Sequence, residues 1–416
     1  MEKKEEKIQV IGQGTYGCVF RPNIECKTKK KGTPDFLSKV QSKDSVSQTE
    51  IEISKKLPNT ERFAGILETC NVTVGEIGEN GIEKCKMLKK DDKLNLISSK
   101  VRYAGNKTIS HFLQELLIEK NKPDKYITEL INGHLYLLQS LIKLNAAGVL
   151  HLDIKYNNIM MKDETPVVID FGLSYDKTYL PIDKYRTIKS LKPFGIAVDY
   201  YIPWCFEIIL LSHVSRYISV SDKKNNIKIL IDSEKERKTI NDKEFNILQD
   251  LVSKYIDEHT ILKMDIFTSD EKEEFKTKMM KWISGFKLKS WRDVWNIIIK
   301  SANSWDNYGL SVMYLMELDI SGLLKVSTKE REGYIIKYIK VLKTIILSSP
   351  DDRNAPTETT KVLTTIFSKV NKSYHSETVD TLSRITKDKG NKKLIKERRE
   401  QGELDDLRKT EYLKNK

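Results

Sequence analysis

The chain has 416 residues, of which 39% are hydrophobic and 31% are charged, and its formal net charge is +13. This length is enough for two or three folding units with a large buried core. No apolar run reaches the roughly 20 residues that a membrane-spanning helix needs, and the first residues do not form a secretory signal, so we expect neither membrane insertion nor secretion.

The positive charge is spread along the chain rather than gathered into one basic patch interleaved with aromatic residues. This distribution favours ATP and acidic proteins as partners and argues against direct nucleic-acid binding. The five cysteines are scattered, at positions 18, 26, 70, 85 and 205, and none forms a CxxC pair. We therefore expect free thiols and an intracellular, cytoplasmic location; a metal site built from Cys26, Cys70 and Cys85 is the alternative.

The first hundred residues are predicted to be rich in strands. They contain, in order, a strand ending at Ile11, a polar loop at 21–34, a strand at 36–40, a helix at 46–57 and short strands within 58–95. Tyr103, Ala104 and Gly105 then interrupt the pattern, and the spacing of apolar residues becomes helical at 109–117 and 126–147. The sequence therefore predicts a strand-rich part followed by a mainly helical one.

A glycine-rich segment follows the first strand, with Gly12, Gly14 and Gly17 spaced as G-x-G-x-x-G. In dinucleotide-binding proteins such a segment opens a helix, whereas here the last glycine leads into a second strand. Glycines let a hairpin close over phosphates without a Cβ clash, and Val19 would lie against a flat base. We therefore predict a phosphate-covering flap with these three glycines and Val19 as nucleotide-binding residues.

A second motif begins at His151, after a helix stop at Gly148. Phosphoryl transfer needs a carboxylate near the attacking hydroxyl, which suits Asp153, and a positive charge near the transferred phosphate, which suits Lys155. Asn158, five residues after the aspartate, can hold a metal ion through its amide oxygen. We predict these three as catalytic residues and His151 as a buried structural histidine.

A third motif, Asp170-Phe171-Gly172, follows an apolar strand at 167–169. The strand delivers a carboxylate at its end, and the glycine permits a sharp turn. Asp170 is therefore a predicted metal ligand, together with Asn158, for a Mg²⁺ ion (Mn²⁺ being an alternative) that bridges nucleotide phosphates.

The three motifs, in this order and spacing, resemble the eukaryotic-type protein-kinase superfamily. The resemblance covers roughly residues 8–370 and implies an α+β, bilobal fold with a small β-rich N-lobe containing one helix and a large, mainly α-helical C-lobe. It implies that Lys39 anchors ATP and pairs with Glu50, preferred over Glu52. It further implies that the backbone of residues 102–104 reads the adenine edge, which adds Tyr103 and Ala104 to the ATP site, and that Met160 and Val19 sandwich the base.

Two later residues also match the family by position. Asp306 resembles the aspartate that holds the backbone of the catalytic loop, and Arg353 resembles the arginine that braces the activation segment. Leu152 stands where many kinases have an arginine that receives a phosphate, so we expect activity without phosphorylation of that segment. No Ala-Pro-Glu sequence is present, and residues 201–207 are expected to replace it, with Glu207 as partner of Arg353.

The expected organisation is an N-lobe at 1–105, a C-lobe at 106–375 with a long insertion at about 217–300, and a charged tail at 376–416 that is solvated helix or disorder. These features resemble the divergent serine/threonine kinases of large nucleocytoplasmic DNA viruses, which implies host cytoplasm or virion as the location. The expected reaction is transfer of the ATP γ-phosphate to serine or threonine hydroxyls of proteins. The alternatives are a small-molecule kinase of the aminoglycoside or choline type and a catalytically inactive ATP-binding scaffold.

Overall fold

The computed structural model describes residues 8–13, 17–26, 32–77, 85, 95–182, 201–222, 228–232, 234–326, 333–370 and 372–414. These residues form two compact units. The first unit consists mainly of residues up to 109 and of 157–174, and the second mainly of 110–156 and 175–405. No helix in the described part of the chain is both long and apolar enough to cross a membrane.

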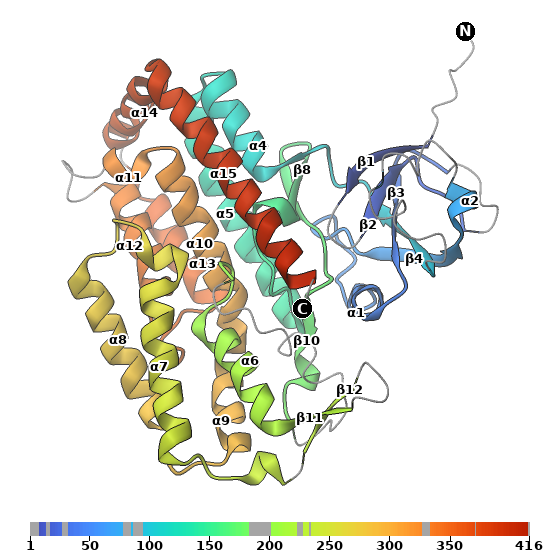
Figure 1. The fold of residues 1–416 in the computed structure, drawn as a ribbon. Coiled ribbons are helices and arrows are strands. Elements are labelled where there is room, and N and C mark those ends of the chain that lie inside the picture. Colours follow the sequence, from blue (N-terminus) through green and yellow to red (C-terminus); the bar gives the residue numbers. More distant parts are fainter. Residues whose placement is uncertain are drawn as a thin grey trace. The chain divides into compact units, whose positions relative to one another are not determined.

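The first unit is built on a five-stranded antiparallel sheet with the order β1-β2-β3-β5-β4 (Figure 1). Its strands are β1 (Gln9–Gln13), β2 (Gly17–Arg21), β3 (Phe36–Ser42), β4 (Ile66–Val72) and β5 (Leu96–Arg102). Among the described residues, the sheet is accompanied by helix α1 (Ser45–Ser54) and the single turn α2 (Val74–Ile77). A smaller sheet has the order β6-β8-β9, from β6 (Lys107–Thr108), β8 (Ile159–Lys162) and β9 (Thr165–Val168).

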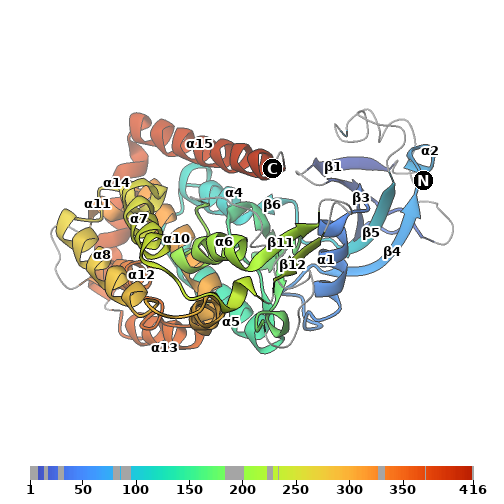
Figure 2. The same cartoon turned by 60° about the horizontal axis from the view of Figure 1, so that its bottom comes forward.

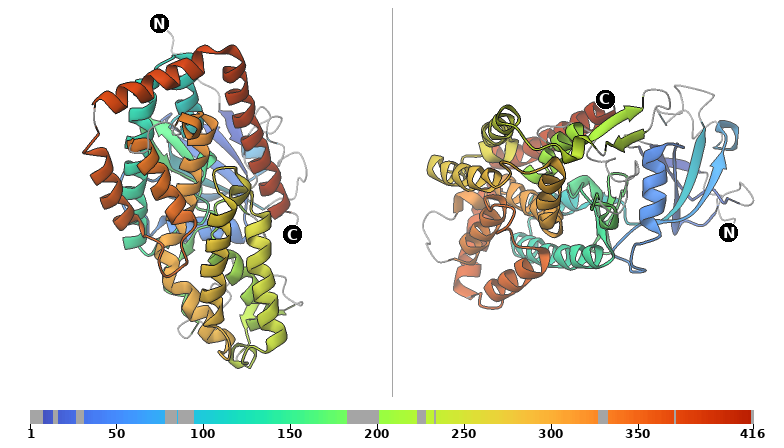
Figure 3. Two further views of the ribbon diagram at one scale, coloured as in Figure 1. Left: turned by 90° about the vertical axis from the view of Figure 1, so that its left-hand side faces the viewer. Right: turned by 90° about the horizontal axis from the view of Figure 1, so that it is seen from below.

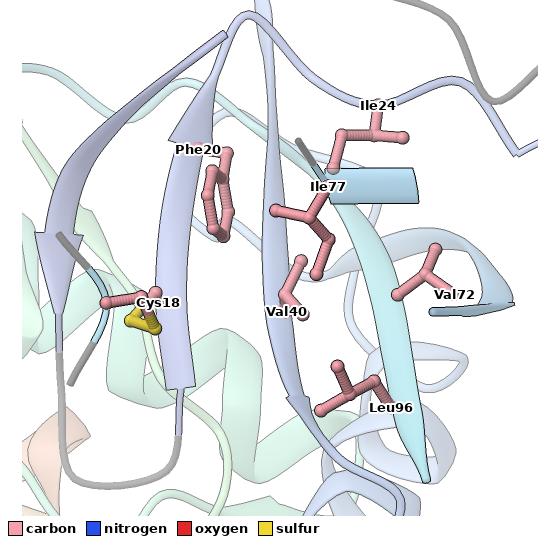
Figure 4. Packing of buried hydrophobic residues seen from close by; sticks show 8 residues of the cluster. Cys18, Phe20, Ile24, Val40, Val72, Ile77 and Leu96 are labelled. Carbon is pink, nitrogen blue, oxygen red and sulfur yellow. A yellow bond between two sulfur atoms is a disulfide. The ribbon is translucent and has the colours of Figure 1, made fainter. Parts of the chain in front are cut away.

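Alternating apolar residues of the large sheet meet on one face and form its core. Phe20 of β2, Val40 of β3 and Leu96 of β5 are each at most 1% exposed and pack with Ile24, Val72 and Ile77 (Figure 4). Period-2 alternation places every second side chain on the same face, which is why these strands share one core. This core fixes β3 in the middle of the sheet and so determines where Lys39 lies.

Four of the five cysteines form disulfides, so the expectation of free thiols is wrong for them, and the alternative metal site does not form. Cys18 of β2 pairs with Cys85, with Cα atoms 6.0 Å apart, and Cys26 pairs with Cys70 of β4, with Cα atoms 5.5 Å apart. Cys205 is a buried free cysteine. Sequence separations of 67 and 44 residues carry no pairing signal, because only the fold of the first unit brings these cysteines together.

The second unit is mainly helical. Its longer helices are α5 (Pro123–Ala146), α6 (Phe206–Ile218), α7 (Asp242–Glu258), α8 (Ser269–Ser284), α9 (Trp291–Ile298), α10 (Trp305–Ile320), α12 (Tyr334–Ile346), α13 (Pro356–Phe367), α14 (Lys372–Lys387) and α15 (Lys389–Lys414). Helix α5 packs against α10, α13 and α14, and α12 packs against α10 and α13 (Figure 3). The strand-rich part and the helical part together confirm the expected α+β fold class.

Shorter elements connect these helices. They are α4 (Ile109–Gln114), the π-helix Glu115–Glu119, α11 (Leu323–Val326), two antiparallel pairs made of β7 (Val149–Leu150) with β10 (Tyr175–Asp176) and β11 (Ser219–Asp222) with β12 (Lys228–Ile231), and 3₁₀ turns at Tyr156–Asn158, Lys177–Tyr179, Lys235–Arg237, Thr260–Lys263 and Ile299–Ser304. Figure 2 shows the β11–β12 hairpin directly after α6.

The C-terminal segment is less solvated than the sequence suggested. It forms α14 and α15, and its apolar residues Leu382 and Ile395 are 0% and 4% exposed. Arg399, in the middle of a highly charged run, is only 3% exposed. The tail is therefore helical, as one of the two expectations had it, but it is not fully solvated, because a sparse apolar stripe among its charges is buried.

Candidate active site

Lys39 lies at the centre of an ion cluster inside the first unit. Its Nζ is 2.8 Å from both carboxylate oxygens of Glu50 on α1 and 2.9 Å from Oδ1 of Asp170. Burial alone would lower the pKa of Lys39, but the carboxylates of Asp170 and Glu50 outweigh burial and raise the pKa above its ordinary value. The lysine is therefore a fixed positive charge, and the predicted choice of Glu50 as its partner is confirmed by the contact.

Helix α1 delivers Glu50 because its start is fixed. Asp44 caps the helix by accepting from the backbone N–H groups of Val46 and Ser47, and the Ser47 hydroxyl accepts in return from the Asp44 N–H. Glu50 is 4% exposed and also accepts from Gln41 Nε2 at 3.2 Å. A buried carboxylate is stable only when paired and hydrogen-bonded, and here both conditions hold.

Asp170 follows β9 in a conformation that few non-glycine residues adopt, with φ of 61°. Such backbone outliers cluster at functional sites. The turn is held because Ile169 N–H donates to Asn158 carbonyl at 2.9 Å, and because Phe171 is fully buried and packs edge-on against Phe63 at 6.3 Å. The structure thereby brings Asp170 to Lys39 and ties the residue before it to Asn158.

Asp170 and Asn158 offer the oxygen ligands that Mg²⁺ prefers. Among the described residues, no group of three or more His, Cys, Asp or Glu side chains forms a metal cluster. A site with one carboxylate and one amide fits an ion that takes its remaining ligands from water and phosphate oxygens, which is the usual situation for Mg²⁺ at nucleotides. The donor set therefore fits the predicted ion.

The glycine-rich segment joins β1 and β2. Gly12 lies opposite Val19 in the β1–β2 pair, and a Cβ at Gly17 would lie 2.3 Å from the Val40 carbonyl oxygen, so Gly17 is required by close backbone packing. A Cβ at Gly12 would meet only Val19 Cβ at 4.0 Å, so the sheet itself does not require that glycine. Gly14, the third predicted glycine, lies outside the described residues.

The predicted adenine-reading segment leaves the end of β5. Tyr103 N–H donates to the Asp35 carbonyl at 3.0 Å, and the Arg21 guanidinium lies 3.9 Å from the centre of the Tyr103 ring. Ala104 is buried, and Gly105 has φ of 107°, where a Cβ would lie 1.9 Å from the Met161 carbonyl oxygen. Because the N–H of Tyr103 is engaged, an adenine partner in this segment has to use other backbone groups.

Met160 lies beside this segment on the smaller sheet. Its strand β8 pairs with β6 through Thr108 and with β9 through Val167. Both Met160 and Val19 are half-buried, as side chains that pack on a ligand would be.

Asp153 lies in the second unit, on residues 151–156, which we call the Asp153 loop. The Asp306 carboxylate of α10 accepts from His151 N–H at 2.7 Å and from Leu152 N–H at 2.8 Å. The predicted role of Asp306 in holding this backbone is therefore confirmed, as is the burial of His151 at 0% exposure. Burial raises the pKa of Asp306, partly opposed by His151 and by the two N–H donors.

Tyr201 contacts the functional end of the Asp153 loop, and sequence reasoning missed it. Its hydroxyl donates to Asp153 Oδ1 and accepts from Lys155 Nζ at 2.8 Å. Lys155 Nζ is also 3.4 Å from Asp153 Oδ1. The ring packs edge-on against Trp204, whose Nε1 donates to the Leu152 carbonyl at 2.7 Å. The Tyr-Ile-Pro-Trp run at 201–204 was a visible signal, but nothing in it indicated contact with Asp153.

Glu207, at the start of α6, pairs with Arg353 as predicted. Arg353 Nη2 donates to Glu207 Oε2 at 3.1 Å, Nη1 donates to Oε1, and the two side chains are 1% and 0% exposed. Burial would lower the pKa of Arg353, but the Glu207 carboxylate outweighs burial and raises the pKa above its ordinary value. The pair fixes the segment 201–207 and thereby Tyr201.

The structure thus assembles two sets of functional groups, each within its own unit: Lys39, Glu50 and Asp170 in the first, and Asp153, Lys155 and Tyr201 in the second. The first set combines a fixed cation with a potential metal ligand. The second combines a carboxylate with a cation that can face a phosphate. Together they have the components that phosphoryl transfer requires.

Comparison with known proteins points the same way. No family model matches the chain. The chain is 28% identical over 167 residues to a probable myosin light chain kinase of Dictyostelium discoideum, which covers 39% of this chain and 44% of that protein. It is 30% identical over 94 residues to the EKC/KEOPS complex subunit BUD32 of Yarrowia lipolytica, covering 21% and 37%. The chain spans less than half the length of these curated relatives, and the similarity supports a kinase function in general.

Proposed function

We propose that the protein is a serine/threonine protein kinase that transfers the γ-phosphate of ATP to protein hydroxyls. The observation that carries this proposal is the cluster in which Glu50 and Asp170 both hold Lys39 within 2.9 Å. A lysine fixed by a buried helix glutamate, beside a partly exposed carboxylate suited to Mg²⁺, is arranged to receive a nucleoside triphosphate. A packing role alone would not need three charged groups at one partly buried point.

In this proposal the first unit binds MgATP. Lys39 pairs with the α- and β-phosphates, and the flap of Gly12, Gly14 and Gly17 covers them. Val19 and Met160 enclose the adenine, while residues 102–104 supply the backbone groups, with Tyr103 offering its carbonyl since its N–H is engaged with Asp35. Asp170 and Asn158 hold Mg²⁺, or alternatively Mn²⁺, which neutralises phosphate charge when bound.

The second unit would supply the acceptor side. Asp153 accepts a hydrogen bond from the attacking hydroxyl and so orients that hydroxyl, and Lys155 offsets the negative charge on the γ-phosphate.

We propose that the enzyme does not need phosphorylation of its activation segment. Leu152 is 2% exposed and offers no charge for a phosphate to pair with. The segment 201–207 is instead anchored by the buried pair of Glu207 and Arg353. Thr178, Tyr185 and Thr187 are the candidate phosphorylation sites of the activation segment. Tyr185 and Thr187 lie outside the described residues, and the hydroxyl of Thr178 donates to Asp176 at 2.7 Å.

We propose that the protein acts inside a cell, where ATP is made. A relationship to the kinases of large nucleocytoplasmic DNA viruses is also part of the proposal. The two disulfides then require an oxidising step or compartment for this chain.

The test is transfer of labelled γ-phosphate from MgATP to casein, with choline and an aminoglycoside as competing acceptors, followed by phosphoamino-acid analysis. We expect phosphoserine and phosphothreonine. Transfer to a small molecule but not to casein would replace the proposal with a small-molecule kinase. MgATP binding without any transfer would indicate an inactive scaffold.

A further inference from the structure

Helix α15 inserts a guanidinium into the interior of the second unit. Arg399 Nη1 donates to the carbonyl oxygen of Ser110 at 3.1 Å and to its hydroxyl at 3.0 Å, at the start of α4. Its Nη2 donates to Glu317 Oε1 on α10, and the two side chains of this ion pair are 2% and 1% exposed. Burying two charges is costly unless they are paired, so these contacts of Nη1 and Nη2 specify the position of Arg399.

Two phenol hydroxyls contact the Glu317 carboxylate in addition to the guanidinium. The hydroxyl of Tyr126 on α5 donates to Oε1 at 2.6 Å, and the hydroxyl of Tyr156 lies 3.4 Å from Oε2. Burial raises the pKa of both tyrosines, Glu317 raises it further, and Arg399 opposes this effect. Tyr126 is therefore the phenol that donates to the carboxylate, whereas the hydroxyl of Tyr156 contacts Oε2 at the longer distance of 3.4 Å.

Tyr156 is the last residue of the Asp153 loop, directly after Lys155. Its hydroxyl also donates to the Met313 carbonyl at 2.7 Å. Asp306, Met313 and Glu317 recur at spacings of seven and four on α10, which places them on one face of that helix. One helix face therefore holds both ends of the loop: Asp306 holds its first residues, and Met313 with Glu317 holds its last.

We propose that Arg399 is a positioning residue for phosphoryl transfer. It fixes the Glu317 carboxylate that the Tyr156 hydroxyl contacts, and it thereby fixes the loop that carries Asp153 and Lys155. The inference depends on the proposed kinase function for its catalytic meaning. Without the guanidinium, Glu317 would keep only phenol donors in a dry interior and would shift or take up water. The end of the loop would shift with it, and a displacement of about 1 Å can cost about 100-fold in rate.

The test compares Arg399→Met with Arg398→Met, a neighbour whose side chain is 37% exposed and 3.6 Å from Asp319. At a temperature where both variants are folded and with saturating MgATP, we expect Arg399→Met to lower kcat about tenfold or more. We expect the KM for ATP to change less than about twofold, because the proposed ATP ligands lie in the other unit, and Arg399→Lys to recover part of kcat. Arg398→Met should keep the wild-type kcat.

A double-mutant cycle separates positioning from general stability. If Arg399 acts through Tyr156, adding Tyr156→Phe to Arg399→Met should lower kcat less than it does in the wild type. Tyr126→Phe also removes a donor from Glu317 but leaves the guanidinium that fixes the carboxylate, so it should lower the melting temperature with a smaller loss of kcat than Arg399→Met. Equal kcat for Arg399→Met and Arg398→Met, or additive effects of Arg399→Met and Tyr156→Phe, would overturn the proposal.

A second readout does not need activity. Hydrogen exchange of backbone amides at 149–156 should accelerate in Arg399→Met, while exchange at 96–102 in β5 stays unchanged. Unchanged exchange at 149–156 would also overturn the proposal. If the wild type transfers no phosphate, the kinase proposal fails, and the exchange result still decides whether Arg399 holds the loop.

Discussion

The hydroxyl of Tyr201 donates a hydrogen bond to Oδ1 of Asp153. The same hydroxyl accepts from Lys155 Nζ at 2.8 Å, and the residue is 1% exposed. The phenol therefore joins the two groups to which we assign the acceptor side of the reaction, and it fixes the direction in which the carboxylate points.

The main effect of removing this hydroxyl should be a lower rate of phosphoryl transfer, with a smaller effect on the free energy of unfolding. We expect Tyr201→Phe to reduce kcat by about 10- to 100-fold, since hydrogen bonds to charged groups contribute about 1.5–3 kcal/mol. The measurement is steady-state kinetics with casein at saturating MgATP. Tyr217→Phe is the matched control, because Tyr217 also stacks on a tryptophan, Trp291, at 4.3 Å. Equal kcat for Tyr201→Phe and Tyr217→Phe would contradict the assigned role.

Glu50 and Glu52 lie on the same helix, α1, and allow a matched comparison of two variants. Only Glu50 contacts Lys39, at 2.8 Å through both oxygens, whereas Glu52 accepts from Gln48 at 3.3 Å. Glu50→Gln should lower kcat/KM for ATP about tenfold or more, because a neutral amide no longer fixes the lysine toward the phosphates. Glu52→Gln should change it less than about twofold. Similar losses of kcat/KM in both variants would show that the Lys39–Glu50 ion pair does not contribute to the use of ATP.

The cysteines give a test that needs no activity. After denaturation without reductant, one thiol should titrate, that of Cys205, since the other four cysteines are paired. Loops of 67 and 44 residues correspond to about 4 kcal/mol of stabilisation for each disulfide in the chain-entropy model. Reduction should therefore lower the melting temperature and accelerate amide exchange in β5. Titration of all five thiols before reduction would rule the disulfides out.

A buried histidine should make the second unit sensitive to acid. Burial lowers the pKa of His134 from 6.5 to about 3, and its Nδ1 lies 2.6 Å from the Tyr338 hydroxyl. The unfolded chain binds a proton near pH 6.5 that the folded chain does not, so the stability from this group is present above pH 6.5 and is lost as pH falls.

The expected contribution of His134 is about 2 kcal/mol of unfolding free energy lost between pH 7 and pH 5. His134→Asn keeps a polar atom near the Nδ1 position and should remove most of that slope in urea unfolding measured at both pH values. An identical slope in the wild type and the variant would show that His134 takes up its proton in the folded state.

Much of this arrangement was predictable because its signals are local in the sequence. Asp170 closely follows a strand, so motif spacing located it. The resemblance to protein kinases located Lys39 and Glu207 together with their partners. The disulfides, Tyr201 and Arg399 were not predictable in this way. Their contacts join residues 44 to 289 positions apart, and the sequence holds no spacing rule for them.

The tail illustrates the same limit in another form. Charged residues dominate 389–402, and average polarity therefore indicated a solvated segment. Yet Ile395 and Arg399, four residues apart, lie on one face of α15 and are both buried. So few buried residues do not change the average polarity of the segment. Only the partner carboxylate of Glu317 explains why an arginine is buried there.

The most direct test of the central claim is single-turnover transfer of labelled γ-phosphate to casein by the wild type and by Asp153→Asn, with MgATP bound equally to both. We expect transfer by the wild type and a loss of about 100-fold or more in the variant, because the carboxylate that orients the hydroxyl is gone while the ATP site is intact. Equal rates in the two proteins, or no transfer by the wild type at full MgATP occupancy, would contradict the account.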